Sequence, residues 1–176
     1  TSEICSLLLS DDYQGGGNGL LLSRCRFMYL DEFRKHFSEK VFAEMRGVSD
    51  EQGLSPLWDA LGSKFFDMEF TEADMLSGLG NKSFIAELMP KYPIYLPMLP
   101  DSARSVIGRV HGNTAPALKM LQAEGFNFNG MVDIFDGGPV VEAFVNTIRT
   151  VRDSRNRHAM VTRKTINLGV PAAERV

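Results

Sequence analysis

The sequence holds 176 residues, of which 44% are hydrophobic and 23% charged, enough to bury the core of one domain. Its formal net charge is -3, from 19 basic and 22 acidic residues, so no global field favours nucleic acid or an anionic membrane. The composition therefore favours a small molecule or another protein as the partner.

Cysteine usage and apolar run length bear on the compartment. Cys5 and Cys25 occur without a CxxC pair or a Cys/His cluster at zinc spacing, which favours reduced thiols in the cytoplasm and implies no metal site. Aliphatic runs such as 7–9 and 20–22 are far shorter than the roughly 20 apolar residues of a membrane-spanning helix. The chain opens without a signal-peptide pattern, and we expect a piece of a longer protein.

The first third of the chain alternates strand and helix signals. A short apolar run at 4–9 predicts a buried strand, and residues 11–18 predict a loop. Apolar residues then recur at helical spacing over 19–37, which predicts an amphipathic helix of about five turns. A second strand is expected at 41–45, and a serine and a first-turn proline at 55–56 predict the start of another helix.

The remaining elements are less regular. The aromatic-rich residues 65–70 suit a strand, whereas four prolines within 84–100 exclude a long helix. A capped helix is expected at 113–125. An Asp-Gly-Gly-Pro turn predicts a hairpin whose strands cover 131–135 and 140–144.

A glycine-rich loop between the first predicted strand and helix carries the strongest chemical signal. It runs Gln14, Gly15, Gly16, Gly17, Asn18, Gly19. Glycines let the backbone bend sharply and bring N–H groups close to a phosphate, and the following helix N-terminus adds partial positive charge. The loop therefore predicts an anion-binding site, with a flexible turn as the alternative.

Two familiar phosphate loops fit this segment poorly. A Walker A loop ends in Gly-Lys-Ser/Thr, but Leu20 and Leu21 follow Gly19. A Rossmann fingerprint read from Gly15 or Gly17 lacks the last glycine or alanine. The spacing is instead similar to the Q/R-x-x-G-x-G/A pyrophosphate loop of GNAT-type acyltransferases.

The chain also resembles the arginine N-succinyltransferase family over most of its length. The stretches that carry the resemblance are CSLLLSDDYQGGGNGLLLSRCRFMYLDEF, VFAEMRGVSDEQGLSPLWDALG, FFDMEF, FIAELMPKYPIYLPMLP, VIGRVHGNTAPALKMLQAEGF and VDIFDGGP. This resemblance implies a GNAT-like α+β (α/β layered) fold, with a mixed sheet flanked by helices and without the amino-terminal strands. Residues 1–150 would form the carboxyl-terminal part of that domain, and 151–176 a basic, poorly ordered tail.

The resemblance also implies an activity and a set of site residues. The enzyme would move succinyl from succinyl-CoA, a co-substrate rather than a tightly bound cofactor, to the α-amino group of L-arginine in arginine catabolism. It would use His111 as proton donor, because an imidazole exchanges protons near neutrality. Leu7 is the residue assigned to succinyl-CoA, and with Leu9 it would pair the pantetheine arm through backbone groups.

The substrate residues are interpretations from position. Arg46 closes the second predicted strand and could pair with the succinyl carboxylate, with a surface ion pair as the alternative. Glu44 is one of five acidic residues that could hold arginine, and the sequence does not rank the five. The others are Asp67, Asp133, Asp136 and Glu142.

Several alternatives remain open at this point. The cofactor-side helix could lie at 55–66 or at 113–126, and Leu121 occupies the position where many GNAT enzymes carry a general-acid tyrosine. The chain could instead be a non-catalytic acyl-CoA-binding or regulatory subunit, or a nucleotide-binding module. A covalent route through Cys5 lacks an evident neighbouring base. The sequence does not decide between a homo-oligomer and a hetero-oligomer.

Overall fold

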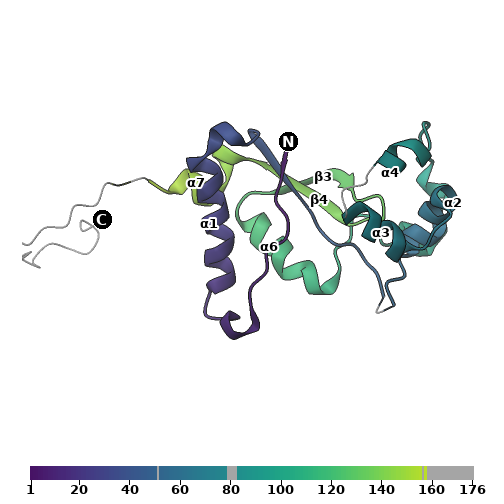
Figure 1. The fold of residues 1–176 in the computed structure, drawn as a ribbon, viewed down its shortest axis with the longest axis horizontal. Coiled ribbons are helices and arrows are strands. Elements are labelled where there is room, and N and C mark those ends of the chain that lie inside the picture. Colours follow the sequence, from purple (N-terminus) through teal and green to yellow (C-terminus); the bar gives the residue numbers. More distant parts are fainter. Residues whose placement is uncertain (51, 79–82, 156, 158–176) are drawn as a thin grey trace, which may run out of the picture.

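The computed structural model describes residues 1–50, 52–78, 83–155 and 157, and within them the fold is α+β. A mixed sheet of four strands has the order β1-β2-β4-β3, and helices lie around it (Figure 1). The strands are β1 Ser2–Glu3, β2 Lys40–Glu44, β3 Asn127–Val132 and β4 Pro139–Phe144.

Strand pairing follows the length of each connection. β1 and β2 pair in parallel, with Ser2 opposite Val41, and the chain between them contains a long helix, as a parallel crossover requires. β4 is antiparallel to both β2 and β3. The expected mixed sheet flanked by helices is confirmed.

One hydrophobic core joins this sheet to three helices. These are α1 Asn18–Glu32, α6 Ala115–Ala123 and α7 Arg149–Asp153, and α1 packs against α7 at one end of the molecule (Figure 1). Its buried members are Phe27, Leu30, Val41, Ala43, Met45, Leu121, Phe126, Val141, Ala143, Val145, Ile148 and Val151. α1 is buried through Phe27 and Leu30, three residues apart on one helix face.

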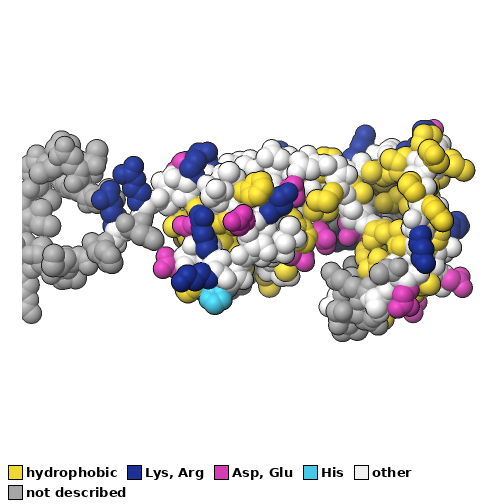
Figure 2. Space-filling view, turned by 90° about the horizontal axis from the view of Figure 1, so that it is seen from above, with side chains coloured by type: hydrophobic (Ala, Val, Ile, Leu, Met, Phe, Trp, Pro, Cys, Tyr) yellow, Lys and Arg dark blue, Asp and Glu magenta, His cyan; other side chains and the backbone are white. Residues whose placement is uncertain are grey.

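A second set of helices lies at the opposite end of the molecule (Figure 1). A π-helical turn Trp58–Gly62 leads into α2 Ser63–Phe66, followed by α3 Phe70–Gly78, α4 Ser83–Leu88 and α5 Asp101–Arg104. Trp58 stacks on both Phe66 and Phe135, with ring centroids 5.3 and 5.4 Å away, and these two rings also contact each other at 6.5 Å. The cluster ties these helices to the β3–β4 turn. Figure 2 shows apolar side chains gathered over this end.

Two predicted strands are wrong. Only Ser2–Glu3 at the start of the chain is a strand, and its last bond runs from Ile4 N–H to Phe42 C=O. Ser6 then takes a positive φ of 52°, a left-handed conformation that breaks an extended strand, so residues 5–10 lie outside the sheet.

The aromatic residues 65–70 are helix and turn instead of strand. α2 ends at Phe66, Asp67 adopts φ 48°, and α3 begins at Phe70. Their aromatic rings pack around Trp58. Burial against a helical cluster overrides the strand preference of aromatic residues.

Other predictions hold with shifted boundaries. α1 ends at Glu32, and a 3₁₀ turn replaces the last predicted helical turn. The first strand of the hairpin is β3, which ends at Val132 instead of reaching residue 135. The 3₁₀ turns are Asp11–Tyr13, Arg34–His36, Leu96–Met98, Gly112–Thr114 and Val145–Thr147. Of the predicted tail, 151–153 end α7, while 156 and 158–176 lie outside the described residues.

Candidate active site

The glycine loop forms an open, left-handed bend before α1. Gly15, Gly16 and Gly17 have φ values of 90°, 59° and 88°, and Asn18 N–H bonds to Gly15 C=O at 3.1 Å. Two successive positive φ values inside such a turn are typical of the type I′ class, which favours glycine. A Cβ added at any of these three glycines would meet no atom within 4 Å. The loop is therefore open to an approaching ligand.

Polar side chains brace this loop from inside. Gln14 Nε2 donates to Asp11 Oδ1 at 2.6 Å, and Asn18 Nδ2 donates to Tyr13 C=O at 2.9 Å. Within the described residues, the backbone N–H groups of Gly16 and Gly17 have no protein acceptor. Free N–H groups at the N-terminus of a 15-residue helix have the arrangement that suits an anion.

The segment before the loop leaves a sheet edge uncovered. β1 pairs with β2 only as far as Phe42, whereas β2 continues to Glu44. Leu7, in the departing segment, is 37% exposed. Leu9 instead lies against the loop, since a Cβ on Gly19 would sit 3.9 Å from its Cδ2. An extended ligand with amide groups could therefore pair with backbone here.

Three segments meet where β2 ends. Gly47 N–H donates to Asp136 Oδ2 at 2.7 Å, and Gly138 N–H donates to Asp136 Oδ1 at 2.8 Å. Asp136 is 8% exposed, so its carboxylate is satisfied by backbone donors inside the protein. Gly47 also pairs with Val110 in an isolated antiparallel bridge. The end of β2, the β3–β4 turn and the segment before α6 thus form one junction.

His111 belongs to this junction. The backbone N–H of His111 donates to Arg46 C=O at 2.8 Å, and its ring Nδ1 accepts from the backbone N–H of Asn113 at 3.2 Å. The imidazole therefore caps the turn that leads into α6, as expected for a residue just before that helix. Because Nδ1 is the acceptor, the neutral ring carries its proton on Nε2.

A cavity of about 420 Å³ opens beside the same junction. Glu44, Arg46, Asp133 and Asp136 supply its charged groups, so the structure brings both predicted substrate residues together. Arg46 Nη2 donates to Ser49 Oγ at 3.0 Å. The cavity joins one guanidinium to several carboxylates, which suits a ligand with both charges. Met45, Phe70 and Phe135 complete its lining.

Glu142, another candidate for holding arginine, lies elsewhere. It sits opposite Phe42 on β4, and its Oε1 accepts from Lys40 Nζ at 2.9 Å. The bond from Lys40 lowers the pKa of the Glu142 carboxyl. Glu142 is therefore engaged within the sheet, outside the cavity beside Arg46.

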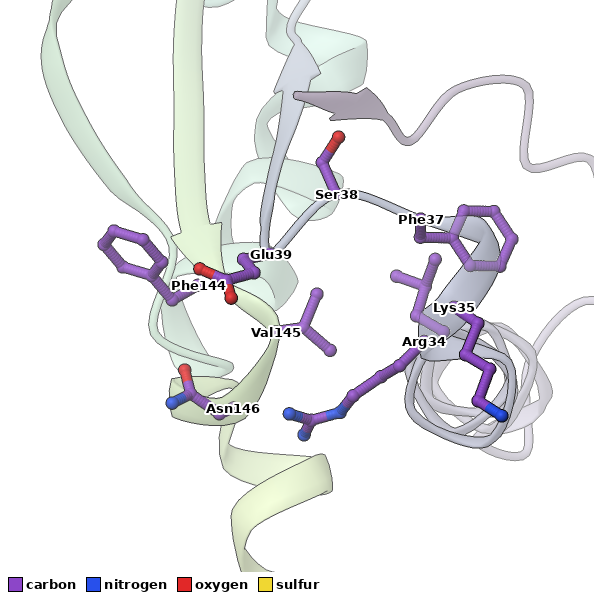
Figure 3. Close-up of a pocket in the computed structure, with 9 residues that line it drawn as sticks. Arg34, Lys35, Phe37, Ser38, Glu39, Phe144, Val145 and Asn146 are labelled. Carbon is purple, nitrogen blue, oxygen red and sulfur yellow. The ribbon is translucent and has the colours of Figure 1, made fainter.

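A further pocket, of about 360 Å³, lies at the other end of β2. Figure 3 shows Arg34 reaching toward Val145 and Asn146 across this pocket, while Lys35 points away. Arg34 Nε also bonds to Asp31 at 2.8 Å. Glu39 lines this pocket and Glu44 lines the cavity beside Arg46, and five residues of extended strand place these two backbone positions about 17 Å apart at 3.4 Å per residue. None of the predicted site residues lines it.

The two helices proposed for the cofactor side pack differently. Leu121 and Phe126 on or after α6 belong to the sheet core, whereas Trp58 and Phe66 belong to the aromatic cluster at the opposite end. Leu121 is 6% exposed, so its side chain serves the core. Which helix faces a cofactor stays a prediction.

Two residues organise the junction in ways that the sequence did not predict. Ser49, which bonds to Arg46, was not among the predicted site residues, and Asp136, which bonds to Gly47 and Gly138, was predicted only as a residue that could hold arginine. The only signal for this junction in the sequence was the run of Asp, Gly, Gly and Pro. That run predicts a simple turn as readily as a buried carboxylate that binds backbone N–H groups. Among the described residues, no cluster of three His, Cys, Asp or Glu side chains could hold a metal ion. The same residues contain no helix long and apolar enough to cross a membrane.

Comparison with known proteins identifies the class of this chain. The sequence model of the family described as "Arginine N-succinyltransferase beta subunit" matches residues 1–150. The chain therefore belongs to the arginine N-succinyltransferase beta subunit family, a family of acyltransferases.

Individual relatives agree with this assignment. The chain is 59% identical over 155 residues to the "Arginine N-succinyltransferase subunit beta" of Pseudomonas aeruginosa PAO1, covering 88% of the chain and 46% of the relative. It is 53% identical over 160 residues to the "Arginine N-succinyltransferase" of Yersinia pestis Pestoides F, covering 91% and 46%. The chain spans about half the length of these curated relatives.

A solved structure has the same fold. The arginine/ornithine succinyltransferase subunit AI from Pseudomonas aeruginosa matches with a TM-score of 0.75 and 37% identity, over 87% of this chain and 43% of that one. At this identity the likeness in fold accompanies a clear likeness in sequence.

Proposed function

We propose that the chain is the CoA-binding part of an arginine N-succinyltransferase that transfers succinyl from succinyl-CoA to the α-amino group of L-arginine. Family membership and the names of the relatives support the reaction. The parallel β1–α1–β2 unit with its glycine loop supports a GNAT-like fold. The single observation that carries the proposal is the open glycine bend at the N-terminus of α1.

CoA is placed by its two polar parts. Its pyrophosphate would accept hydrogen bonds from the N–H groups between Gly15 and Gly19, helped by the α1 dipole. Its pantetheine amides would pair with backbone near Leu7 and Leu9, along the edge where β1 leaves β2. This path leads from the loop toward the end of β2.

The reaction is proton-balanced between amine and sulfur. The neutral α-amine attacks the thioester carbonyl, the C–N bond forms, the C–S bond breaks, and the proton lost by the amine matches the one gained by the CoA thiolate. His111 would be the proton donor to the sulfur as an imidazolium, through Nε2–H, because its Nδ1 faces the Asn113 N–H at 3.2 Å. The proton that the amine loses in the attack would return the ring to its charged form. Its attachment to the junction beside the charged cavity supports this role.

Substitution of His111 tests the mechanism. His111→Asn keeps a side-chain acceptor able to cap the following turn, so it removes the acid with little loss of structure. In the full-length enzyme, kcat should fall by about 100-fold to 10,000-fold while CoA affinity survives, since that is the range of positioned acid catalysis. A variant with near-parental kcat and an unchanged pH profile would rule out His111 as the donor and assign the role to another group or to solvent.

The charged cavity would hold the two substrates' polar ends. Arg46 would pair with the succinyl carboxylate, and Glu44 would hold a cationic group of arginine. Arg46→Ala should therefore lower the preference for succinyl-CoA over acetyl-CoA by roughly 10-fold or more, as loss of a charge-assisted pair does. Lys35→Ala, a charge-matched substitution outside this cavity, should keep the parental ratio. Equal ratios in Arg46→Ala and the parent would rule out this role.

A second candidate function follows from the covered length. Because the chain spans 46% of its relatives, it could bind acyl-CoA as a subunit that turns over only with a further polypeptide. The "beta subunit" description of its family supports such a partner. Assaying the chain alone with succinyl-CoA and arginine separates the two: turnover supports the enzyme, and CoA binding without turnover supports the subunit.

A further inference from the structure

One peptide unit connects Asp136 to His111. The peptide between Arg46 and Gly47 donates its N–H to Asp136 Oδ2 at 2.7 Å. The same peptide accepts the His111 N–H on its C=O at 2.8 Å. Hydrogen bonds in series polarise one another, so a change at the Asp136 carboxylate alters the hydrogen bond made by the His111 backbone N–H.

Close backbone packing holds this peptide in place. A Cβ on Gly47 would lie 2.6 Å from Asp136 Oδ1, and a Cβ on Gly138 would overlap Met45 C=O. Gly108 N–H also donates to Gly137 C=O at 2.8 Å. The segment that carries His111 is thus attached to the Asp136 turn directly through Gly108, and indirectly through the Arg46–Gly47 peptide that Asp136 holds.

We propose that Asp136 is a positioning residue for His111. Its two oxygens fix Gly47 and Gly138, and through the Arg46–Gly47 peptide they set the backbone position from which the imidazole donates its proton. The proposal rests on the proposed function of His111. It removes Asp136 from the residues expected to hold arginine, because both of its oxygens accept backbone N–H groups.

A double-mutant cycle in the full-length enzyme tests the coupling. In Asp136→Asn the amide offers one oxygen, so one of the two backbone donors loses its acceptor. The kcat should fall by about 10-fold to 100-fold, since a displacement near 1 Å can cost that much, with KM for succinyl-CoA within about two-fold. Added to His111→Asn, Asp136→Asn should lower kcat by no more than about two-fold further, because residues acting as a unit are non-additive.

Glu124→Gln is the matched control. Glu124 is a carboxylate 1% exposed that accepts Thr150 N–H at 2.8 Å, so its loss also weakens a buried backbone contact. Its partners lie on α1 and α7, away from the junction. Its effect on kcat, if any, should multiply with that of His111→Asn. Multiplying effects for Asp136→Asn as well would overturn the proposal and leave the role of His111 standing.

Amide hydrogen exchange decides the remaining cases. In the parent enzyme the N–H groups of Gly47 and His111 should show similar protection, and in Asp136→Asn both should lose it together. A His111 N–H that exchanges about 100-fold faster than that of Gly47 in the parent would contradict coupling, since the two would then open separately. The comparison of the two N–H groups in the parent enzyme does not require any variant to fold. It also holds when His111→Asn keeps full activity, which would sink only the proposed proton donor.

Discussion

Two glycine-rich regions of this chain use the same residue for opposite reasons. At Gly15, Gly16 and Gly17 the backbone is left-handed and nothing lies within 4 Å of an added Cβ. At Gly47 and Gly138 an added Cβ would overlap the facing backbone. Glycine in the first region leaves space for a ligand, and in the second it lets two segments of the protein touch. A glycine cluster therefore indicates that something approaches the backbone closely, but it does not tell whether that is a ligand or another segment of the protein.

The closed region should be the more sensitive to added volume. Gly138→Ala places a methyl group against Met45 C=O, and the backbone there has little freedom to move. We expect a loss of roughly 3 kcal/mol in the free energy of unfolding, at the upper end of overpacking effects, measured by urea denaturation. Gly78→Ala, where the added Cβ meets nothing, should cost no stability. Equal stabilities of the two variants would refute the close contact.

A buried carboxylate at another place in the core sharpens the comparison. Glu124 Oε1 lies 2.5 Å from Arg149 Nη2 and 3.3 Å from Arg24 Nε. Burial alone raises the pKa of the Glu124 carboxyl, but bonds from Thr150 and Arg149 outweigh it, so the pKa lies below its ordinary 4.5. Glu124→Gln should cost about 1–3 kcal/mol near neutral pH, the usual penalty for a broken buried charged bond.

The sign of the pH dependence follows from the lowered pKa. The contribution of Glu124 is complete above the unfolded pKa near 4.5 and is lost as the pH falls through the lower folded value. The gap in thermal midpoint between parent and Glu124→Gln should therefore close below that pH. Asp153→Asn breaks an exposed pair with Arg152 and should leave the midpoint unchanged. A gap that stays constant to low pH would contradict this assignment.

Local signals explain which parts of the fold could be predicted. The glycine loop, β2, the turn before α6 and the hairpin are each encoded by residues close in sequence. The strand predicted at 4–9 is wrong because a single left-handed residue, Ser6, ends the pairing. An apolar run gives no indication of such a residue. The role of Asp136 was out of reach because Gly47 is 89 residues away. The strand predicted at 65–70 is wrong because aromatic side chains that suit a strand also suit the core between helices.

The most direct test of the account is whether the open glycine loop holds the CoA pyrophosphate. Calorimetric titration should show CoA binding far more tightly than pantetheine, which lacks the pyrophosphate, and more tightly than ATP or NAD. Gly17→Val should weaken CoA binding by about 10-fold to 100-fold, because helix N–H groups and backbone approach supply a few charge-assisted bonds, and should leave pantetheine binding unchanged. Gly130→Val, with a similar φ of 86° and equally open space, should keep parental affinity. Unchanged CoA affinity in a folded Gly17→Val variant would contradict the central claim.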